Sequence, residues 1–256
     1  MKNLTSSVDK TFAILDHFTI QNPAWSVTEL SKVMGSNKST VYRFLSDLEK
    51  LGAMYQDAET GKYSLGLKLF ELGKKVRLQS AFVDKTHPEL IKVAENITET
   101  VHIALLDQKQ VYYIDKVKSP QGLTIDTEIG SRKPLHATSL GKVLLAHTCE
   151  NEAQLEEFLP KGSLIPCTPN THTDLASLSG ELDDIRKYGY AVDREEYEIG
   201  LICVAVPIFN QDNGLVASMS AAGPANRFKE EELMNYVRML QSGAQAIREK
   251  IGTFQL

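Results

Sequence analysis

The stretch SVTELSKVMGSNKSTVYRFLSDLEKLG, residues 26–52, constrains the fold more than any other part of the chain. It encodes two short helices separated by a sharp break. Ser26 and Glu29 form a capping-box pattern, in which each side chain can bind the other residue's free backbone N–H. Gly35 permits a tight turn where the first of these helices ends. The stretch therefore predicts a helical hairpin. The function of the hairpin has to be inferred from the residues around it.

Apolar residues recur at helical spacing in three neighbouring segments, which predicts three helices packed on one another. The first helix has a cap at Ser6 or Ser7, and the third begins near Ser36 or Asn37. The side chains expected in the shared core are Val8, Phe12, Leu15 and Phe18, then Val27, Leu30, Val33 and Met34, then Val41, Phe44, Leu45, Leu48 and Leu51. Two short alternating segments around a turn at 60–62 predict a β-hairpin. Three helices followed by a hairpin make a winged helix-turn-helix.

This core leaves one face of the third helix in solvent, and the residues on that face suit DNA. A recognition helix lies in the major groove with its N-terminal residues near the base edges. Hydroxyl and ammonium groups can hold phosphates, and Arg43 can pair with guanine. The predicted DNA contacts are Ser36, Lys38, Ser39, Thr40, Tyr42, Arg43 and, at the tip of the hairpin, Lys62. A winged helix that binds a protein partner is the alternative.

Charge is distributed unevenly along the chain. Residues 1–79 carry 11 Lys and Arg against 8 Asp and Glu, whereas the remaining residues carry 17 against 25. A basic beginning and an acidic remainder predict two domains with different partners. There is no run of about 18 apolar residues and no apolar core of a secretory signal, so no membrane partner is expected. The three cysteines lack CxxC spacing, which favours a reducing cytoplasm and argues against a zinc site.

Residues 67–81 resume a helical pattern, with Leu67, Phe70 and Leu72 expected inside. A helix between two domains can carry a dimer contact, and the alternative is that it only packs on the winged helix. The expected domains are a winged helix-turn-helix DNA-binding domain in residues 1–66, a linker helix in 67–81, and an effector-binding and oligomerisation domain in 82–256.

The third region alternates between strand-like and helical segments. Strands are expected at 101–107, 110–118, 122–130, 190–196, 201–210 and 215–223. Helices are expected at 85–98, 139–148, 152–159, 174–188 and 229–251. Mostly antiparallel strands flanked by helices predict an α+β fold, broadly like a GAF or PAS sensor domain.

The third region contains no recognisable catalytic motif. GxSxG, HExxH, Walker A and GxGxxG are all absent. Cys203 with His102, His136 or His172 could form a thiol nucleophile. However, Cys203 stands in an apolar strand, where an inert buried cysteine is the commoner case. We therefore expect a binding domain and not an enzyme, with no cofactor and no metal.

A ligand pocket is predicted where a helix begins at Ser139 and Leu140. Free backbone N–H groups at a helix N-terminus attract a carboxylate. Asp193 lies at a strand end, where polar side chains line pockets, while Cys203 and Ser220 would match hydroxyls and limit size. The implied ligand is a small organic acid with hydroxyl groups. The alternative is an ordinary capped helix over a filled core.

Three segments resemble the IclR family of bacterial transcriptional regulators, namely KSTVYRFL, HATSLGKVLLA and GYAVDREEYEIGLICVAVPIFN. In the last segment the family's spacing is met by Gly189, Asp193, Glu196, Cys203, Ala205, Ile208, Phe209 and Asn210. The resemblance covers Ser7 to about Ile251. It implies a winged-helix domain, a linker helix, an effector domain with a curved antiparallel sheet, dimers that associate into tetramers, and a palindromic double-stranded DNA operator.

Within the family, KYSLGLKLFELG, ETVHIALLD and GLICVAVPIF are similar to the KdgR-type branch of repressors of pectin and hexuronate degradation. This implies control by 2-keto-3-deoxygluconate or a close relative. Carried over by position, the family's effector contacts are the amides of Ser139 and Leu140 with Asp193, Cys203 and Ser220. Ala222 stands where some glyoxylate- and pyruvate-binding members have a second serine, which favours a longer ligand. The alternative is a regulator in the same family that senses glyoxylate, pyruvate or an aromatic acid and acts as an activator.

Overall fold

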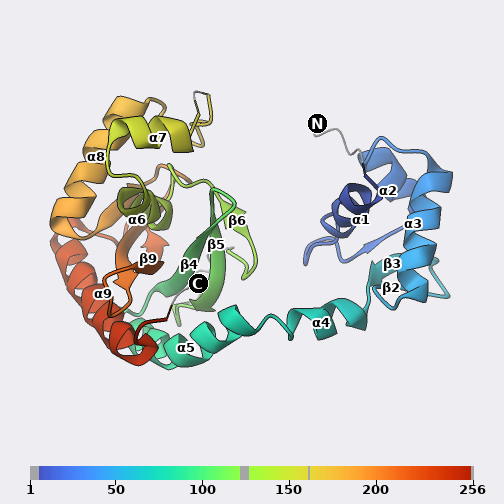
Figure 1. Cartoon of the computed structure of the whole chain (residues 1–256), viewed down its shortest axis with the longest axis horizontal. Helices are drawn as coiled ribbons and strands as arrows, with labels where there is room; N and C mark the ends of the chain where they lie inside the picture. The colour runs from blue at the N-terminus through green and yellow to red at the C-terminus, as the bar shows by residue number, and fades with distance from the viewer. Residues whose placement is uncertain (1–5, 122–126, 161, 255–256) are drawn as a thin grey trace. The chain divides into compact units, whose positions relative to one another are not determined.

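The computed structural model describes residues 6–121, 127–160 and 162–254 (Figure 1). The chain divides into two compact units, Met1–Arg77 and Leu78–Leu256. Part of the strand predicted at 122–130, namely residues 122–126, lies outside the described residues.

The N-terminal unit packs helices and a small sheet around one core. Its helices are α1 (Ser7–Leu15), α2 (Val27–Val33), α3 (Lys38–Lys50) and α4 (Leu67–Gly73). Its strands are β1 (Ala24–Trp25), β2 (Met54–Gln56) and β3 (Tyr63–Leu65), which pair antiparallel in the order β1-β3-β2. The core includes Ile14, Leu30, Val41, Leu45 and Tyr63. The predicted winged helix-turn-helix is confirmed, with the β2–β3 hairpin as the wing.

Local sequence determines where the helices of the hairpin begin and end. The Ser26 hydroxyl accepts the Glu29 N–H at 3.2 Å, and the Glu29 carboxylate accepts the Ser26 N–H at 2.8 Å. The predicted capping box is therefore confirmed, and it contributes on the order of 1 kcal/mol to the helix. Gly35 has φ +60°, a conformation that glycine adopts without steric cost. This glycine turns the chain from α2 toward α3.

The core of the N-terminal unit differs in part from the predicted one. Val8, Phe12, Val33 and Leu51 are exposed, whereas Ile14 is almost fully buried. The prediction is confirmed for Leu15 and Phe18, which pack in or against this core, and is wrong for Val8 and Phe12. Helix α1 carries apolar residues on two sides, so its pattern does not single out one face. The strand β1 was also not predicted, since two residues are too few to show an alternating pattern.

The predicted linker helix is also different in the structure. The range 67–81 contains α4 and the beginning of α5 (Arg77–Ile97), which are separated at residues 74–76. Leu67, Phe70 and Leu72 were expected inside, but all three are exposed. Among the described residues of the N-terminal unit, therefore, no neighbour covers these three side chains.

The C-terminal unit is built on one six-stranded antiparallel sheet in the order β6-β5-β4-β9-β8-β7. The strands are β4 (Thr100–Asp107), β5 (Gln110–Val117), β6 (Arg132–Lys133), β7 (Ala191–Arg194), β8 (Leu201–Phe209) and β9 (Leu215–Pro224). Besides α5, the helices are α6 (Ser139–Thr148), α7 (Glu152–Phe158), α8 (Leu175–Tyr188) and α9 (Glu230–Ile251). The α+β class with a curved antiparallel sheet is thus as predicted.

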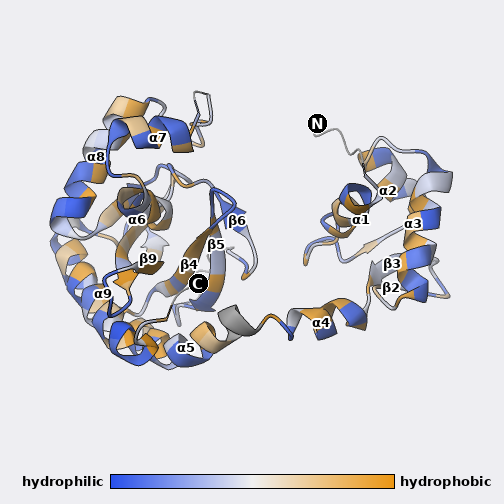
Figure 2. Ribbon diagram, in the orientation of Figure 1, coloured by the Kyte–Doolittle hydropathy of each residue, from blue (hydrophilic) through white to orange (hydrophobic). Residues whose placement is uncertain are grey.

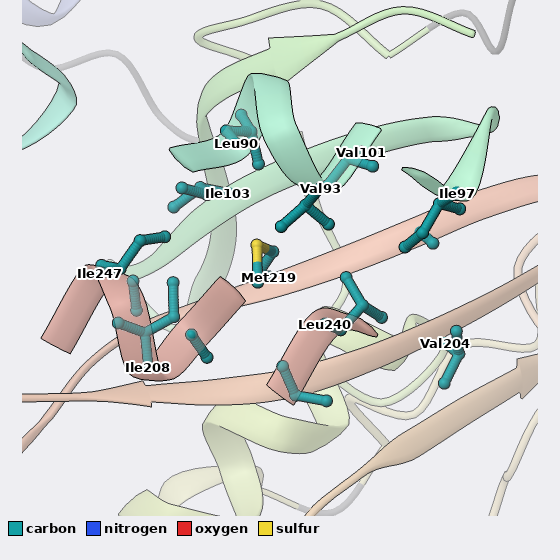
Figure 3. Close-up of a cluster of buried hydrophobic side chains, with 14 of the residues drawn as sticks. Leu90, Val93, Ile97, Val101, Ile103, Val204, Ile208, Met219, Leu240 and Ile247 are labelled. Carbon is teal, nitrogen blue, oxygen red and sulfur yellow. The ribbon is translucent and has the colours of Figure 1, made fainter. Parts of the chain in front are cut away.

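The two faces of this sheet carry separate cores. On one face, side chains of α5 and α9 such as Val93 and Leu240 pack against Ile103 and Met219 (Figure 3). On the other face, α6, α7 and α8 cover small strand residues that include Ala104 and Ala205. Ile103 and Ala104 serve opposite cores because successive side chains of a strand alternate between its faces.

Helix α6 lies closest to the sheet and is largely hydrophobic, in contrast to α7 (Figure 2). A Cβ atom added to Gly141 would lie 2.2 Å from the carbonyl oxygen of Leu135, so only glycine allows this approach. This close packing holds the first turn of α6 against the segment that leads into it from β6. Among the described helices, none is both long and apolar enough to cross a membrane.

Candidate effector pocket and DNA-binding helix

The N-terminal end of α3 presents polar side chains to solvent. Lys38, Ser39, Tyr42 and Arg43 are exposed and Thr40 is half-buried, while Ser36 is exposed just before the helix. Within the described residues, neither Lys38 nor Arg43 has an ion-pair partner. Both cations are therefore available to a phosphate or a base.

The cap of α3 also leaves backbone donors available. Asn37 occupies the N-cap position, but its side chain makes no capping hydrogen bond. The first N–H groups of a helix have no intrahelical partner and attract anions. A DNA phosphate at this end would receive donors from the backbone as well as from Lys38 and Ser39.

Lys62 lies in the wing, where its ammonium pairs with the Glu29 carboxylate at 3.5 Å. Glu29 also caps α2, so Lys62 leans toward the helical hairpin and away from the tip of the wing. The pair is substantially exposed, and exposed pairs contribute about 0–1 kcal/mol. DNA could thus displace the Glu29 carboxylate at little cost, and the role of Lys62 stays a prediction.

In the C-terminal unit, one pocket brings together all five predicted effector contacts: Ser139, Leu140, Asp193, Cys203 and Ser220. Its empty volume is ≈ 480 Å³, counting the open space at its mouth. The sheet register creates this arrangement, because Asp193 pairs with Cys203 across β7 and β8, while Ala205 of β8 pairs with Ser220 of β9.

The N-terminus of α6 forms one wall of the pocket. The Thr138 hydroxyl caps the helix by accepting the Gly141 N–H at 3.2 Å, and the Thr138 carbonyl accepts the Lys142 N–H at 2.9 Å. Ser139 and Leu140 occupy the first positions of the helix, so their N–H groups have no intrahelical partner. Both residues are buried at the pocket. This wall can bind a carboxylate through two backbone donors and the helix dipole.

Asp193 forms the opposite polar wall. Burial raises the pKa of this carboxyl to about 7, although the N–H groups of Glu196 and Tyr197 donate to it at 2.7 and 3.4 Å. Near neutral pH, Asp193 is therefore present in both protonation states. The protonated form can donate a hydrogen bond to a ligand oxygen, and the ionised form can accept one from a ligand hydroxyl.

Cys203 lies beside Asp193, and burial raises the pKa of its thiol well above the usual value. A thiol with a raised pKa is a poor nucleophile, because the thiolate is the reactive form. The geometry therefore fits a side chain that contacts a ligand and limits the size of the pocket.

The pocket also has polar residues that the sequence analysis did not assign to it, namely His102, Tyr113, Lys133, Tyr197 and Glu198. Lys133 donates to the Tyr197 hydroxyl at 2.6 Å, and its ammonium lies 4.7 Å from the centre of the Tyr197 ring. These two residues come from the β6 strand and the β7–β8 loop, two short segments without periodic patterns. No sequence pattern could have identified them.

A buried ion-pair network lies behind the pocket. The side chain of Lys142, in α6, is fully buried and donates to Glu181 and Glu196 at 2.7 and 2.6 Å. It also donates to the carbonyl of Val192 at 2.7 Å. The Glu196 N–H donates in turn to Asp193. Lys142 thus joins the helix that forms one pocket wall to the segment that forms the other.

The same network includes the group of residues that, in the described part of the chain, could hold a metal ion. Ligand atoms of His172, Glu181 and Glu196 lie within 4.8 Å of one another. However, the ammonium of Lys142 already binds both carboxylates, and His172 lies 2.8 Å from Glu181. The hydrogen bond to Glu181 raises the pKa of His172, which favours a second cation in the cluster. The carboxylates are thus neutralised by side chains of the protein, and the cluster does not require a metal.

A helix-turn-helix in one unit and a pocket lined with polar side chains in the other define a DNA-binding regulator with a sensor domain. Residues 7–58 match the IclR helix-turn-helix domain, and residues 78–249 match the bacterial transcriptional regulator IclR C-terminal domain. The chain therefore belongs to the IclR family of transcriptional regulators. The prediction that it is a regulator and not an enzyme is confirmed.

Individual relatives agree with this membership. The HTH-type transcriptional regulator KdgR of Escherichia coli (strain K12) is 38% identical over 247 residues, which cover 96% of this chain and 93% of the relative. The HTH-type transcriptional regulator XynR of the same organism is 34% identical over 249 residues, which cover 97% of this chain and 98% of the relative. The crystal structure of the Thermotoga maritima IclR has a TM-score of 0.76 and 35% identity, with 96% of this chain and 98% of that chain covered.

Proposed function

We propose that this protein is a cytoplasmic repressor of genes for sugar-acid catabolism, in pectin and hexuronate degradation, and that a small organic acid such as 2-keto-3-deoxygluconate controls its binding to DNA. The observation that carries the proposal is the single pocket lined by Ser139, Leu140, Asp193, Cys203 and Ser220. The resemblance to the KdgR-type branch supports the choice of ligand.

The pocket has a suitable donor or acceptor for each part of such an acid. The carboxylate would bind the N–H groups of Ser139 and Leu140, and hydroxyls along the chain would bind Asp193 and Ser220. Ala222 also lines the pocket and has no hydroxyl, which leaves room for a chain longer than pyruvate. Regulators that sense glyoxylate, pyruvate or an aromatic acid are the alternatives, and an activator is the alternative to a repressor.

Control of DNA binding requires a difference in affinity between two arrangements of the protein. An inducer must bind the DNA-free arrangement more tightly than the DNA-bound one, and DNA must weaken inducer binding by the same factor. The Lys142 network is a candidate for the element that changes, because it connects both walls of the pocket.

We expect 2-keto-3-deoxygluconate to raise the melting temperature of the protein. A ligand at 100 times its dissociation constant stabilises by about 2.7 kcal/mol, which corresponds to about 5–10 °C for a chain of this size. The shift should disappear in Asp193→Ala. Asp212→Ala is the matched control, because Asp212 is an exposed carboxylate in the turn between β8 and β9.

The same thermal-shift screen separates the alternatives. Glyoxylate, pyruvate and 4-hydroxybenzoate are tested beside the hexuronate catabolites. If 2-keto-3-deoxygluconate leaves the melting temperature unchanged while one of these acids raises it, the sugar-acid assignment is wrong and that acid class replaces it. If the shift survives in Asp193→Ala, the effector does not bind in this pocket.

We also propose that the protein binds a palindromic operator as a homodimer, or as a tetramer built from dimers. Helix α4 and the end of α3 form an exposed apolar groove that includes Leu51, Leu67 and Phe70. Charges of both signs flank the groove, since Lys68 and Lys75 pair with Glu71. A twofold interface must be self-complementary, and a surface with an apolar centre and mixed charges suits contact with its own copy.

We expect Phe70→Asp to reduce the mass of the assembled protein in light scattering, because the carboxylate would be desolvated inside the apolar interface. Operator affinity should fall in parallel, since the two half-sites would no longer be bound together. Ile20→Asp is the control, because Ile20 is another exposed apolar residue of the same unit and lies outside the groove. An unchanged mass for Phe70→Asp would exclude α4 from the dimer contact.

A further inference from the structure

One side chain in the effector pocket has an unused hydrogen-bonding atom. His102, in β4, lines the pocket and is only 2% exposed. Its Nε2 atom has no hydrogen-bond partner among the described residues. A buried polar atom without a partner costs about 1–3 kcal/mol, so such atoms in native proteins usually have a purpose or a missing partner.

Two other histidines, the buried His136 and the half-buried His147, help to interpret this one. Nε2 of His136 lies 3.0 Å from the carbonyl oxygen of Ile165, so its hydrogen bond is made within the protein. His147 also has an unpartnered Nε2, but its ring packs edge-on against Phe209 and does not line the effector pocket. His102 alone among these three rings combines an unpartnered nitrogen with a place at the pocket.

The surroundings of His102 set its chemistry. It pairs with Ser220 across β4 and β9, and its ring lies edge-on to Tyr113 with the centres 5.3 Å apart. Burial, assisted by the charge of Lys116, lowers the pKa of His102 to about 3. The ring is therefore neutral in the cell, with one N–H donor and one lone pair. A neutral imidazole suits a hydroxyl, to which it can donate or from which it can accept a hydrogen bond. The carboxylate finds stronger donors at the N-terminus of α6.

We propose that His102 is a specificity-determining residue that binds a hydroxyl on the carbon chain of the effector, away from the carboxylate held by α6. This inference rests on the proposed function, because it requires that the pocket bind a small organic acid. Together with Ser220, His102 gives the sheet wall of the pocket a polar patch. The patch selects acids that carry further oxygens over acids that end in a methyl group.

The test compares two ligands and two variants by isothermal titration calorimetry. The ligands are 2-keto-3-deoxygluconate, which has hydroxyls along its chain, and pyruvate, which has none. His102→Leu removes both ring nitrogens at similar volume, and His102→Gln keeps an amide at a similar reach. We expect His102→Leu to weaken binding of 2-keto-3-deoxygluconate about tenfold or more. His102→Gln should retain affinity within about threefold, and pyruvate should bind all three proteins alike.

The outcomes separate this inference from the proposed function. If the wild-type protein binds 2-keto-3-deoxygluconate and His102→Leu binds it equally well, the role of His102 is wrong and the proposed function stands. If the wild-type protein binds neither acid, or pyruvate alone, the proposed effector is wrong and the inference falls with it.

A second measurement keeps the test decisive if His102→Leu does not fold. The imidazole ¹⁵N resonances of the wild-type protein are recorded with and without 2-keto-3-deoxygluconate, and His102 is assigned by its loss in His102→Gln. The Nε2 resonance should move when this ligand binds, because the nitrogen gains its first hydrogen-bond partner. A resonance that does not move at saturation would overturn the inference.

Discussion

Replacing Arg43 with alanine is expected to weaken operator binding by about 1–3 kcal/mol for each recognition helix, and by up to about 6 kcal/mol for a dimer that uses two. Arg43 is exposed on the solvent face of α3 and has no acidic partner among the described residues. Folding should be retained, because the core side of α3 consists of Val41, Leu45 and Leu48. The operator can be obtained by selection from random DNA, and affinity measured by gel-shift titration.

Two further variants sharpen this test. Lys50→Ala is the matched control, because Lys50 is an exposed cation at the other end of α3 and pairs with Asp47. Arg43→Lys distinguishes the two possible contacts, since lysine keeps a phosphate contact but cannot form the two parallel hydrogen bonds that arginine makes with guanine. If Arg43→Ala binds the operator as tightly as the wild-type protein, Arg43 has no part in recognition.

Local sequence was sufficient to predict most of the secondary structure. Ser26 and Glu29 indicate where α2 begins, and Gly35 indicates where it ends. Both signals can be predicted because capping and positive φ depend on neighbouring residues alone. The apolar periodicity of α1 was visible as well, but it did not reveal which face is buried. Phe12 is exposed and Ile14 is buried. Which of the two faces of α1 is buried is determined only by the packing of α1 against the other helices.

The linker illustrates the same limit at the level of assembly. The apolar residues Leu67 and Phe70 were expected inside because apolar side chains are usually covered. In the single chain they are exposed. The apolar periodicity of a helix indicates that one of its faces is buried. It cannot distinguish burial against the same chain from burial against a second copy of the chain. In the proposed dimer, the second copy of the chain would bury this face.

The pocket was predictable only where its residues lie close in sequence to a recognisable feature. Ser139 and Leu140 begin a helix, and Asp193 stands at a strand end. His102 was considered only as a partner of a catalytic cysteine, because its place beside Ser220 depends on the pairing of β4 with β9. That pairing joins strands from opposite ends of the domain, and no local pattern encodes it.

No local pattern predicts a role for Lys142, because lysine is seldom fully buried and the partners of this lysine are distant in the chain. Glu181 is 39 residues away and Glu196 is 54. Removal of one member of a buried ion pair leaves an uncompensated charge, which typically costs about 3–5 kcal/mol. The loss is larger than the gain from the pair itself, because Glu196 is left without its cation and Glu181 keeps only its contact with His172.

Lys142→Met is therefore expected to lower the free energy of unfolding by about 3–5 kcal/mol, although methionine fills a similar volume. Urea titration followed by tyrosine fluorescence measures the change, and Lys187→Met, which removes an exposed cation from α8, should alter it by less than about 0.5 kcal/mol. Adding Glu196→Gln to Lys142→Met should restore part of the loss, since it removes one of the unpaired charges. If Lys142→Met is as stable as the wild-type protein, the free-energy cost of desolvating the lysine equals the free energy gained from its attraction to the carboxylates. The network would then not stabilise the fold, and its role would be to connect Asp193 to α6.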